Sequence, residues 1–337
     1  MSQLAERPVS SRPPDGQRSR VRRLAGAHES GVLVATLTIF AVCALTLPNF
    51  LDTANLLSIA QQIALIGIVG VGMTFVIVSG EIDLSVGSQF GFLSVFLAWL
   101  VTVQGIPVGP AALITVLVGL LIGLVQGLVV TLLSVPSFVV TLAGLSVLRG
   151  AALLVSKGVP VNGSSNQTFR SVTGGTLFGS LTAQTLWMAG LLIIFSWVLA
   201  RTKFGYDVYA SGGNRRAASQ AGIRTAVVKT SCFALTGACS GLAAVILVGW
   251  LGSANPLTGS GFELSVIAAV VVGGAGLAGG VGSITGTFFG AVVAGMIANA
   301  LTLSGIDGNW QPVATGLLIL GAVLINRFVG IRQTNLR

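Results

Sequence analysis

Apolar positions along this chain gather into long runs separated by short polar stretches, and the runs set the first prediction. Most approach twenty residues, the length at which an α-helix crosses the hydrocarbon part of a bilayer. The pattern predicts an all-α integral membrane protein with about ten transmembrane helices. The expected spans are 31–47, 55–78, 84–103, 110–133, 137–156, 185–200, 230–250, 262–275, 281–303 and 312–328.

Composition agrees with a membrane protein. Hydrophobic residues make up 53% of the chain and charged residues only 8%, against about 25% charged residues in soluble domains. The 46 glycines suit a bundle in lipid, because small residues let helices approach closely and also break helices where a pore requires it.

Known catalytic and metal-binding patterns do not occur in the sequence. It has no G-x-x-x-x-G-K-[ST] phosphate loop, and its one histidine, His28, lies in a polar leader. Cys43, Cys232 and Cys239 lie in or beside apolar runs without metal-ligand spacing, so we expect small core residues. We therefore expect no catalytic residue, no metal and no cofactor, and a protein that is not an enzyme.

Basic residues concentrate in three segments. A leader (1–30), a polar loop (201–229) and the tail from residue 327 onward together hold 15 of the 18 lysines and arginines. Because basic residues favour the cytoplasmic side, the sequence predicts a multi-pass protein of the cell (inner) membrane with both termini cytoplasmic. We expect a disordered basic leader over 1–30, a transmembrane domain over 31–330 and a cytoplasmic tail over 331–337.

The loop 201–229 contains a turn signal, Gly212-Gly213-Asn214. Asn214 is a residue type that caps helices, and the sequence after it predicts a short helix ending near Gly222. A short helix held between two spans can act as a lever. An ordinary basic loop that only fixes orientation is the alternative.

Two stretches break the helical pattern at membrane depth, 77–88 and 272–283. Both are broken by glycine and end in Val-Gly-Ser. A degenerate internal repeat is therefore one interpretation of the pair. Non-helical backbone at this depth is tolerated only where protein or water satisfies its polar groups. Transporters place substrate routes at such broken helices.

Several polar residues fall in or near the apolar runs. Intramembrane acids are functional candidates, so Glu81 and Asp83 stand out, with Arg149 as a possible partner for either. The alternative is a wetted interfacial turn, in which Asp83 caps the next helix; Glu263 fits a helix-start carboxylate. Side-chain amides inside the apolar runs have two interpretations: each binds a solute in a pore, or each joins two helices by a hydrogen bond. The translocation-path candidates are Gln61, Gln62, Asp83, Ser85 and Asn299, and Gln126 is a further amide inside an apolar run.

Four motifs in register give the chain a family resemblance. From about residue 32 to 330 it resembles the permease subunits of bacterial ABC importers for monosaccharides, the ribose, xylose and galactose branch. The motifs are SGEIDLSVGS at 79–88, YASGGN at 209–214 with AASQAGI at 217–223, PLTGSGFEL at 256–264 and AAVVVGGAGLAGGVGSITGTFFGA at 268–291.

The resemblance implies a cytoplasmic ABC ATPase subunit, a periplasmic or lipid-tethered sugar-binding protein and a second permease copy or paralogue as partners, with membrane lipid and no nucleic acid. It also implies a coupling helix after Gly-Gly-Asn, with Ala217, Ala218 and Ala221 as a small-residue face for the ATPase. The ATPase-coupling residues on this resemblance are Gly212, Gly213, Asn214, Ala217, Ala218, Gly222 and Ile223.

The chain departs from that family pattern at two places. Arg215 and Arg216 stand where the family often has an acid, and Glu81 stands where many relatives have glycine. Two other functions stay open. One is an ion-coupled secondary transporter of a small polar solute, in which Glu81, Asp83 and Arg149 relay ions or protons. The other is a membrane scaffold that transports nothing.

Overall fold

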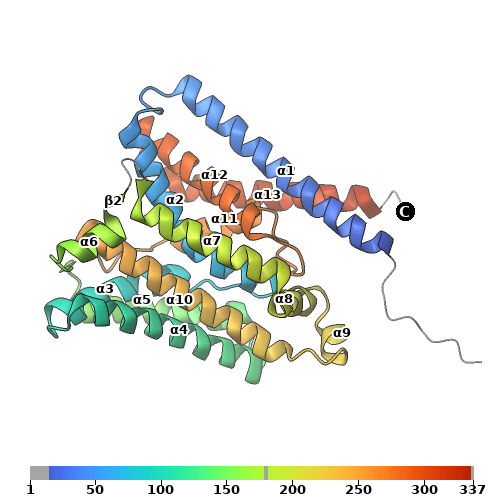
Figure 1. Cartoon of the computed structure of the whole chain (residues 1–337), viewed down its shortest axis with the longest axis horizontal. Coiled ribbons are helices and arrows are strands. Elements are labelled where there is room, and N and C mark those ends of the chain that lie inside the picture. Colours follow the sequence, from blue (N-terminus) through green and yellow to red (C-terminus); the bar gives the residue numbers. More distant parts are fainter. Residues whose placement is uncertain (1–14, 178–180, 335–337) are drawn as a thin grey trace, which may run out of the picture.

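The computed structural model describes residues 15–177 and 181–334 as a bundle of α-helices around two central ones. These are α2 (Thr53–Val78) and α10 (Thr225–Leu251), and most of their residues are buried. Seven further long helices enclose them (Figure 1): α1 (Asp15–Thr46), α3 (Val86–Thr102), α4 (Val108–Leu132), α5 (Ser137–Ser156), α7 (Ala183–Arg201), α12 (Ile284–Leu303) and α13 (Trp310–Thr334).

Short elements mark the two ends of the bundle. One end carries α6 (Gln167–Gly174) and two small antiparallel pairs, β1 (Val161–Asn162) with β4 (Ser253–Ala254) and β2 (Thr176–Leu177) with β3 (Leu181–Thr182). The opposite end carries α8 (Lys203–Gly213) and α9 (Arg215–Gln220). The start of α1 and the end of α13 lie at the α8 end as well (Figure 1).

Each of the ten predicted runs falls on a helix, and the all-α membrane class is confirmed. Within the described residues, six helices are long and apolar enough to cross a membrane by length and composition, and four apolar segments are shorter. The count of ten crossings stays a prediction. The shortest of the ten helices is α11 (Phe262–Val272), with 11 residues and thus about 16 Å long, half of an apolar layer of about 30 Å.

Some sequence boundaries differ from the structure. Helix α1 begins at Asp15, so part of the leader that we expected to be disordered is helical, whereas residues 1–14 lie outside the described residues. The helices α6 and α8 were not predicted. The two Val-Gly-Ser stretches are not equivalent, since the first is in the opening turns of α3 and the second precedes α12, which Ser283 caps.

Glycines hold α4 against α10. Gly119, Gly123 and Gly127 repeat every four residues along one face of α4, and a Cβ at any of them would overlap the backbone of α10. The reverse holds for Gly237, whose Cβ would overlap the carbonyl of Gly119. Small residues at this spacing allow two helix backbones to touch, so α4 and α10 pack without side chains between them.

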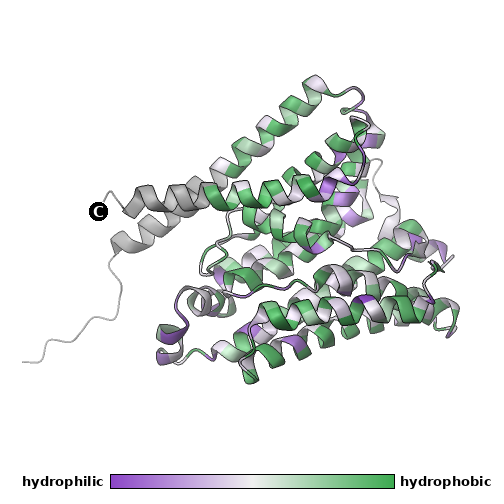
Figure 2. Cartoon of the chain, turned by 180° about the vertical axis from the view of Figure 1, so that it is seen from behind, coloured by the Kyte–Doolittle hydropathy of each residue, from purple (hydrophilic) through white to green (hydrophobic). Residues whose placement is uncertain are grey.

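The outer surface of the bundle is apolar. Figure 2 shows hydrophobic residues along the outer helices, and the side chains of α4 that point away from α10 are exposed leucines and valines, Leu113, Leu117, Leu120, Leu121, Val125 and Leu128. Exposed leucine over several turns suits contact with lipid chains.

Candidate functional site

Three segments meet at the α8 end: the chain after α2, the end of α8 and the break between α11 and α12. Their contact consists of five glycines, Gly80, Gly212, Gly213, Gly279 and Gly280, which we call the glycine junction.

Backbone touches backbone throughout the glycine junction. The amide of Gly280 donates to the carbonyl of Val78 over 2.8 Å. A Cβ at Gly212 would overlap that same carbonyl and the amide of Gly280. Tyr209 of α8 adds a bond of 2.6 Å from its hydroxyl to the carbonyl of Gly282. Because the five glycines bring the backbones of the three segments into direct contact, a shift of α8 reaches both breaks directly.

The short helix after Asn214 is confirmed. The side-chain oxygen of Asn214 accepts from the amide of Ala217 at 3.0 Å and so caps α9. At the other end, Gly222 has φ +83°; its amide bonds to Ser219, and the amide of Ile223 bonds to Ala218. This pair of bonds is a Schellman motif, so both ends of α9 are fixed.

Residues predicted to couple to an ATPase take different roles. Ala218 is only 4% exposed, so the expected face of three alanines is wrong at its middle member: Ala217 and Ala221 are exposed and Ala218 points into the protein. Gly212 and Gly213 lie in the glycine junction, and Ile223 packs against a buried cluster. Arg215 and Arg216 share the exposed surface of α9.

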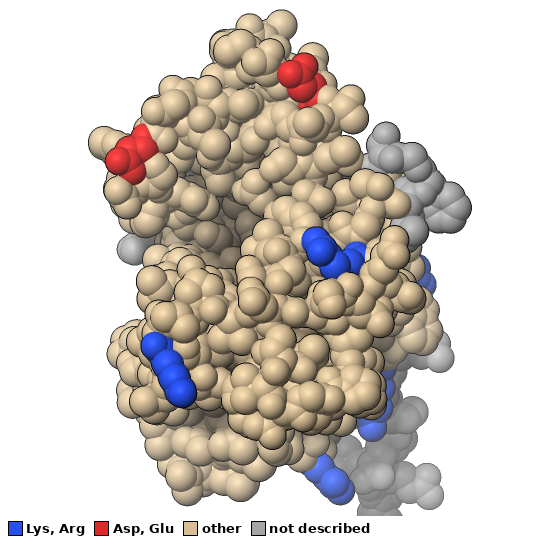
Figure 3. Space-filling view, turned by 90° about the vertical axis from the view of Figure 1, so that its left-hand side faces the viewer, with Lys and Arg blue, Asp and Glu red and all other residues tan. Residues whose placement is uncertain are grey.

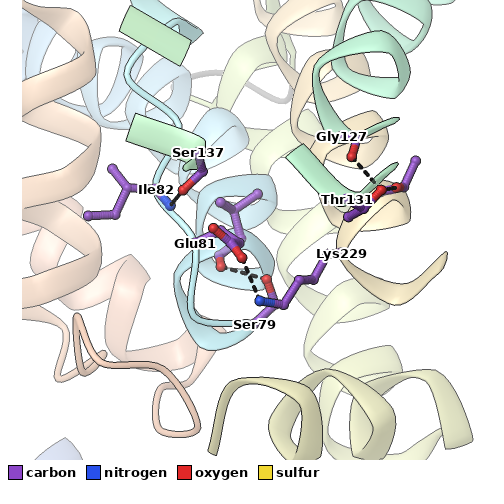
Figure 4. Close-up of polar contacts among 9 residues, drawn as sticks. Ser79, Glu81, Ile82, Gly127, Thr131, Ser137 and Lys229 are labelled. Atoms are coloured by element: carbon purple, nitrogen blue, oxygen red, sulfur yellow. Dashed lines mark hydrogen bonds and ion pairs between the residues drawn. The ribbon is translucent and has the colours of Figure 1, made fainter. Parts of the chain in front are cut away.

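Glu81 has a partner that the sequence did not suggest. The ammonium of Lys229 lies 2.5 Å from its carboxylate, and Figure 4 shows the lysine reaching from α10 to the chain after Ser79. The two side chains are 7% and 14% exposed. The sequence pattern places Lys229 in the polar loop, whereas α10 already begins at Thr225, so the lysine lies in the first turns of that helix.

Arg149 pairs with neither acid, contrary to the sequence hypothesis. Its guanidinium donates to the carbonyls of Pro256 and Thr258, at 3.3 and 3.1 Å. It therefore fixes the turn that leads into α11. The same turn packs tightly on α3, since a Cβ at Gly91 would overlap the Thr258 carbonyl.

Asp83 closes a turn in front of α3 but does not cap the helix, because Ser85 is the N-cap residue and its side chain makes no capping bond, and the turn is not wetted. One carboxylate oxygen accepts from the amide of Ser85 at 2.8 Å and from its hydroxyl at 2.6 Å, and the residue is fully buried. Gln89 and Gln126 bond to the same hydroxyl at 2.7 and 3.0 Å. The four side chains form one buried network between α3 and α4.

The remaining translocation-path candidates, Asn299, Gln61 and Gln62, lie in different surroundings. Asn299 exchanges side-chain bonds of 2.7 and 3.3 Å with Asn55, so it joins α12 to the start of α2 as helix glue. Gln62 lines a hollow between α2, α11 and α13, whereas Gln61 does not. Among the described residues, no group of three or more histidines, cysteines or acids could hold a metal ion.

The apolar multi-helix bundle, the half-length helix and the two glycine-rich breaks are features of polytopic membrane transport proteins. Comparison gives the family: residues 55–326 match the family described as branched-chain amino acid transport system / permease component. The chain belongs to this family of ABC-transporter permeases.

Curated relatives cover most of the chain. It is 39% identical to the probable ABC transporter permease protein YphD of Escherichia coli K12, over 94% of this chain and 96% of that one. It is 38% identical to the ribose import permease protein RbsC of Bacillus subtilis 168 (83% and 87%), and 34% identical to the L-arabinose ABC transporter permease protein AraH of Azospirillum brasilense (97% of each). No solved structure matches the chain significantly.

Proposed function

We propose that this protein is the membrane-spanning subunit of an ABC importer that moves a monosaccharide or similar small polyol across the inner membrane. A partner ATPase supplies the energy. The observation that carries the proposal is the likeness, over nearly the whole chain, to permeases whose names specify ribose and L-arabinose. The bundle adds the parts that such a subunit needs, namely broken helices and an exposed, rigid helix α9.

The α8 end is the cytoplasmic end in this proposal. The start of α1, the end of α13 and the loop with α8 and α9 lie together there (Figure 1), and the three basic segments of the sequence hold 15 of its 18 basic residues. Positive residues favour the cytoplasmic side. The ATPase then docks at α9, and the sugar-binding protein docks at the opposite end, where α6 and the strands lie. A second copy of this chain or a paralogue completes the transporter.

The glycine junction explains how docking at α9 would move the transport path. Helix α9 is joined to α8 through its Asn214 cap, and α8 touches both breaks through backbone contacts. A push by the ATPase on α9 then displaces the ends of α2 and α12 without first compressing side chains. We expect this contact to change between the closed and open forms of the permease.

Uptake by the purified parts tests the function. The permease is reconstituted into liposomes with its ATPase and sugar-binding protein, and entry of labelled D-ribose and L-arabinose is followed. We expect uptake that requires ATP and the ATPase. Uptake without the ATPase that collapses when an ionophore is added would show a secondary transporter instead, and absence of uptake for both sugars would remove the sugar assignment.

A further inference from the structure

A hollow of about 440 Å³ lies between α2, α11 and α13. It falls in the range of about 300–1,000 Å³ that is usual for small-molecule sites. It narrows into a second hollow of about 30 Å³ that shares five lining residues with it, space for about one water molecule. The shared residues are Gln62, Ile66, Ser265, Gln311 and Thr315.

The larger hollow extends from the turn between α12 and α13, where Gly308 lines it, to mid-depth in the bundle. Phe262, the first residue of α11, lines it, and the other end of α11 leads into the break that joins α8 at the glycine junction. Since α11 is about 16 Å long, its first residue lies about half an apolar layer away from the α8 end. Helices that begin inside the membrane are where transporters hold their solutes.

The hollow's lining combines two kinds of surface. Phe90 and Phe262 stack with ring centres 4.8 Å apart and planes at 21°, which gives an aromatic wall. The same lining includes three hydroxyl residues and two amide residues, Ser260, Ser265, Thr315, Gln62 and Gln311. In the described part of the chain, Gln311 and Ser265 have no side-chain hydrogen bond, and Gln62 has one, at 3.3 Å to Ser58. Several donors and acceptors are thus free for a ligand.

Charge is missing from this lining, because none of its residues is acidic or basic. A charged ligand in this hollow would find no oppositely charged side chain, and its transfer out of water would be unfavourable. A neutral ligand with many hydroxyls can use the amides and hydroxyls, and the C–H face of its ring can pack on the phenylalanine wall. On α13, the polar residues Gln311 and Thr315 line the hollow, whereas Leu317 and Leu320 of the same helix are exposed on the surface.

We propose that this hollow is a binding site for the uncharged polyhydroxylated substrate on its way through the permease. Gln62 and Gln311 hydrogen-bond the hydroxyls of the ligand, and the ring of the ligand packs against Phe262 and Phe90. The proposal rests on the proposed sugar import and assigns it a place and residues. Figure 3 looks at the end of the bundle opposite α8 and shows a hollow in a largely uncharged surface, which is the side from which the substrate enters.

The test uses the complete reconstituted transporter and whichever of D-ribose and L-arabinose the unaltered protein imports. Gln62→Leu and Gln311→Leu keep most of the side-chain volume and remove the amide. Each should lower uptake about tenfold, the effect of losing a hydrogen bond to the ligand, while ATPase binding and dimer formation stay unchanged. Gln104→Leu, the same change in the turn between α3 and α4, should import at the unaltered rate.

A second measurement reports occupancy rather than rate. Thr315→Cys, in a protein whose three native cysteines are replaced by alanine, is labelled with a small uncharged thiol reagent. Saturating sugar should slow the labelling by roughly threefold or more, as expected when the ligand occupies most sites, and should not slow it at Gln104→Cys. The site would be overturned if the two leucine variants import normally and sugar does not slow the labelling of Thr315→Cys.

Two further outcomes would also overturn the site. Loss of dimers in Gln311→Leu would make this face a contact between permease copies. Protection of Thr315→Cys by added lipid rather than sugar would make it a lipid groove. Failure of the unaltered transporter to import either sugar instead defeats the proposed function, so the two failures are distinguishable.

Discussion

Lys229 and Glu81 are 148 positions apart in the sequence, yet they form a nearly buried ion pair. Such a pair is costly to break from one side, because the remaining charge has no counter-ion and little water. Lys229 holds α10 to the chain that follows α2, so its charge contributes to the position of the first break.

Removal of the lysine alone should therefore destabilise the protein strongly. Lys229→Met should lower the free energy of unfolding by about 3–5 kcal/mol, measured by thermal unfolding in detergent. The double variant Glu81→Gln, Lys229→Met removes both charges and should recover much of that loss. Equal losses in the single and double variants would contradict a pair.

Asp83 offers a contrasting case, because its role depends on hydrogen bonding. Asp83→Asn keeps an oxygen that accepts from the amide and hydroxyl of Ser85, so the variant should fold and import near the normal rate. Asp83→Ala leaves the buried amide of Ser85 without this acceptor, whereas the hydroxyl can still donate to Gln126, and the change should cost about 1–3 kcal/mol in the same unfolding measurement. If Asp83→Asn fails to fold and Arg149→Gln restores it, the two residues interact after all.

Local spacing explains which residue-level predictions succeeded. Asn214 three residues before Ala217 is a pattern that the sequence displays directly, and so is Asp83 two residues before Ser85, although that second pair closes a turn rather than capping α3. The Lys229–Glu81 pair and the contact of Arg149 with the turn at Pro256 join residues more than a hundred positions apart. Hydropathy and spacing carry no information on such contacts.

At the scale of elements, α9 is the surface on which the coupling proposal depends. Ala217 and Ala218 are neighbours in sequence, but only Ala217 is exposed. The same substitution at the two positions therefore separates docking from folding.

Ala217→Glu should fold with normal thermal stability but fail to bind or stimulate the ATPase, so uptake should stop. Ala218→Glu buries a charge without a partner and should lower stability by several kcal/mol. Co-purification of the ATPase and thermal unfolding measure the two effects. Normal uptake by Ala217→Glu with the ATPase present would remove α9 from the coupling surface.

The helices themselves were predictable because apolar runs report helix positions well. The half-length of α11 was not. Its apolar run continues into Gly273 and Gly274, so hydropathy extends the expected span to residue 275, whereas the glycines let the chain turn: Gly274 has φ +93°. Sequence therefore located the break correctly and misjudged how far the helix reaches before it.

For the whole molecule, the orientation in the membrane is the prediction to test. Ser219 of α9 is exposed and suits a cysteine reporter. In intact cells, Ser219→Cys should resist an impermeant thiol reagent and react after the membrane is opened, whereas Gln104→Cys at the other end should react at once. Reaction of Ser219→Cys in intact cells would show that the protein has the opposite orientation and would contradict the coupling proposal.

The all-α membrane class followed from composition and the apolar runs, but the central contact of the bundle did not. Motifs near residues 80, 212 and 280 were each recognisable alone. Their meeting in the glycine junction depends on three chain segments that fold back on one another, and glycines give no sign of which other glycines they touch.

The glycine face between α4 and α10 has a mechanical consequence. Two helices in backbone contact over several turns resist bending as a pair, so they behave as one beam. Helix α10 has 27 residues and is about 40 Å long, and it carries Lys229 near one end and leads into β4 at the other. A beam that pivots near its middle moves its two ends in opposite directions. If an ATPase docks at α9 as proposed, its nucleotide turnover would then reach the other side of the membrane as a tilt of α10.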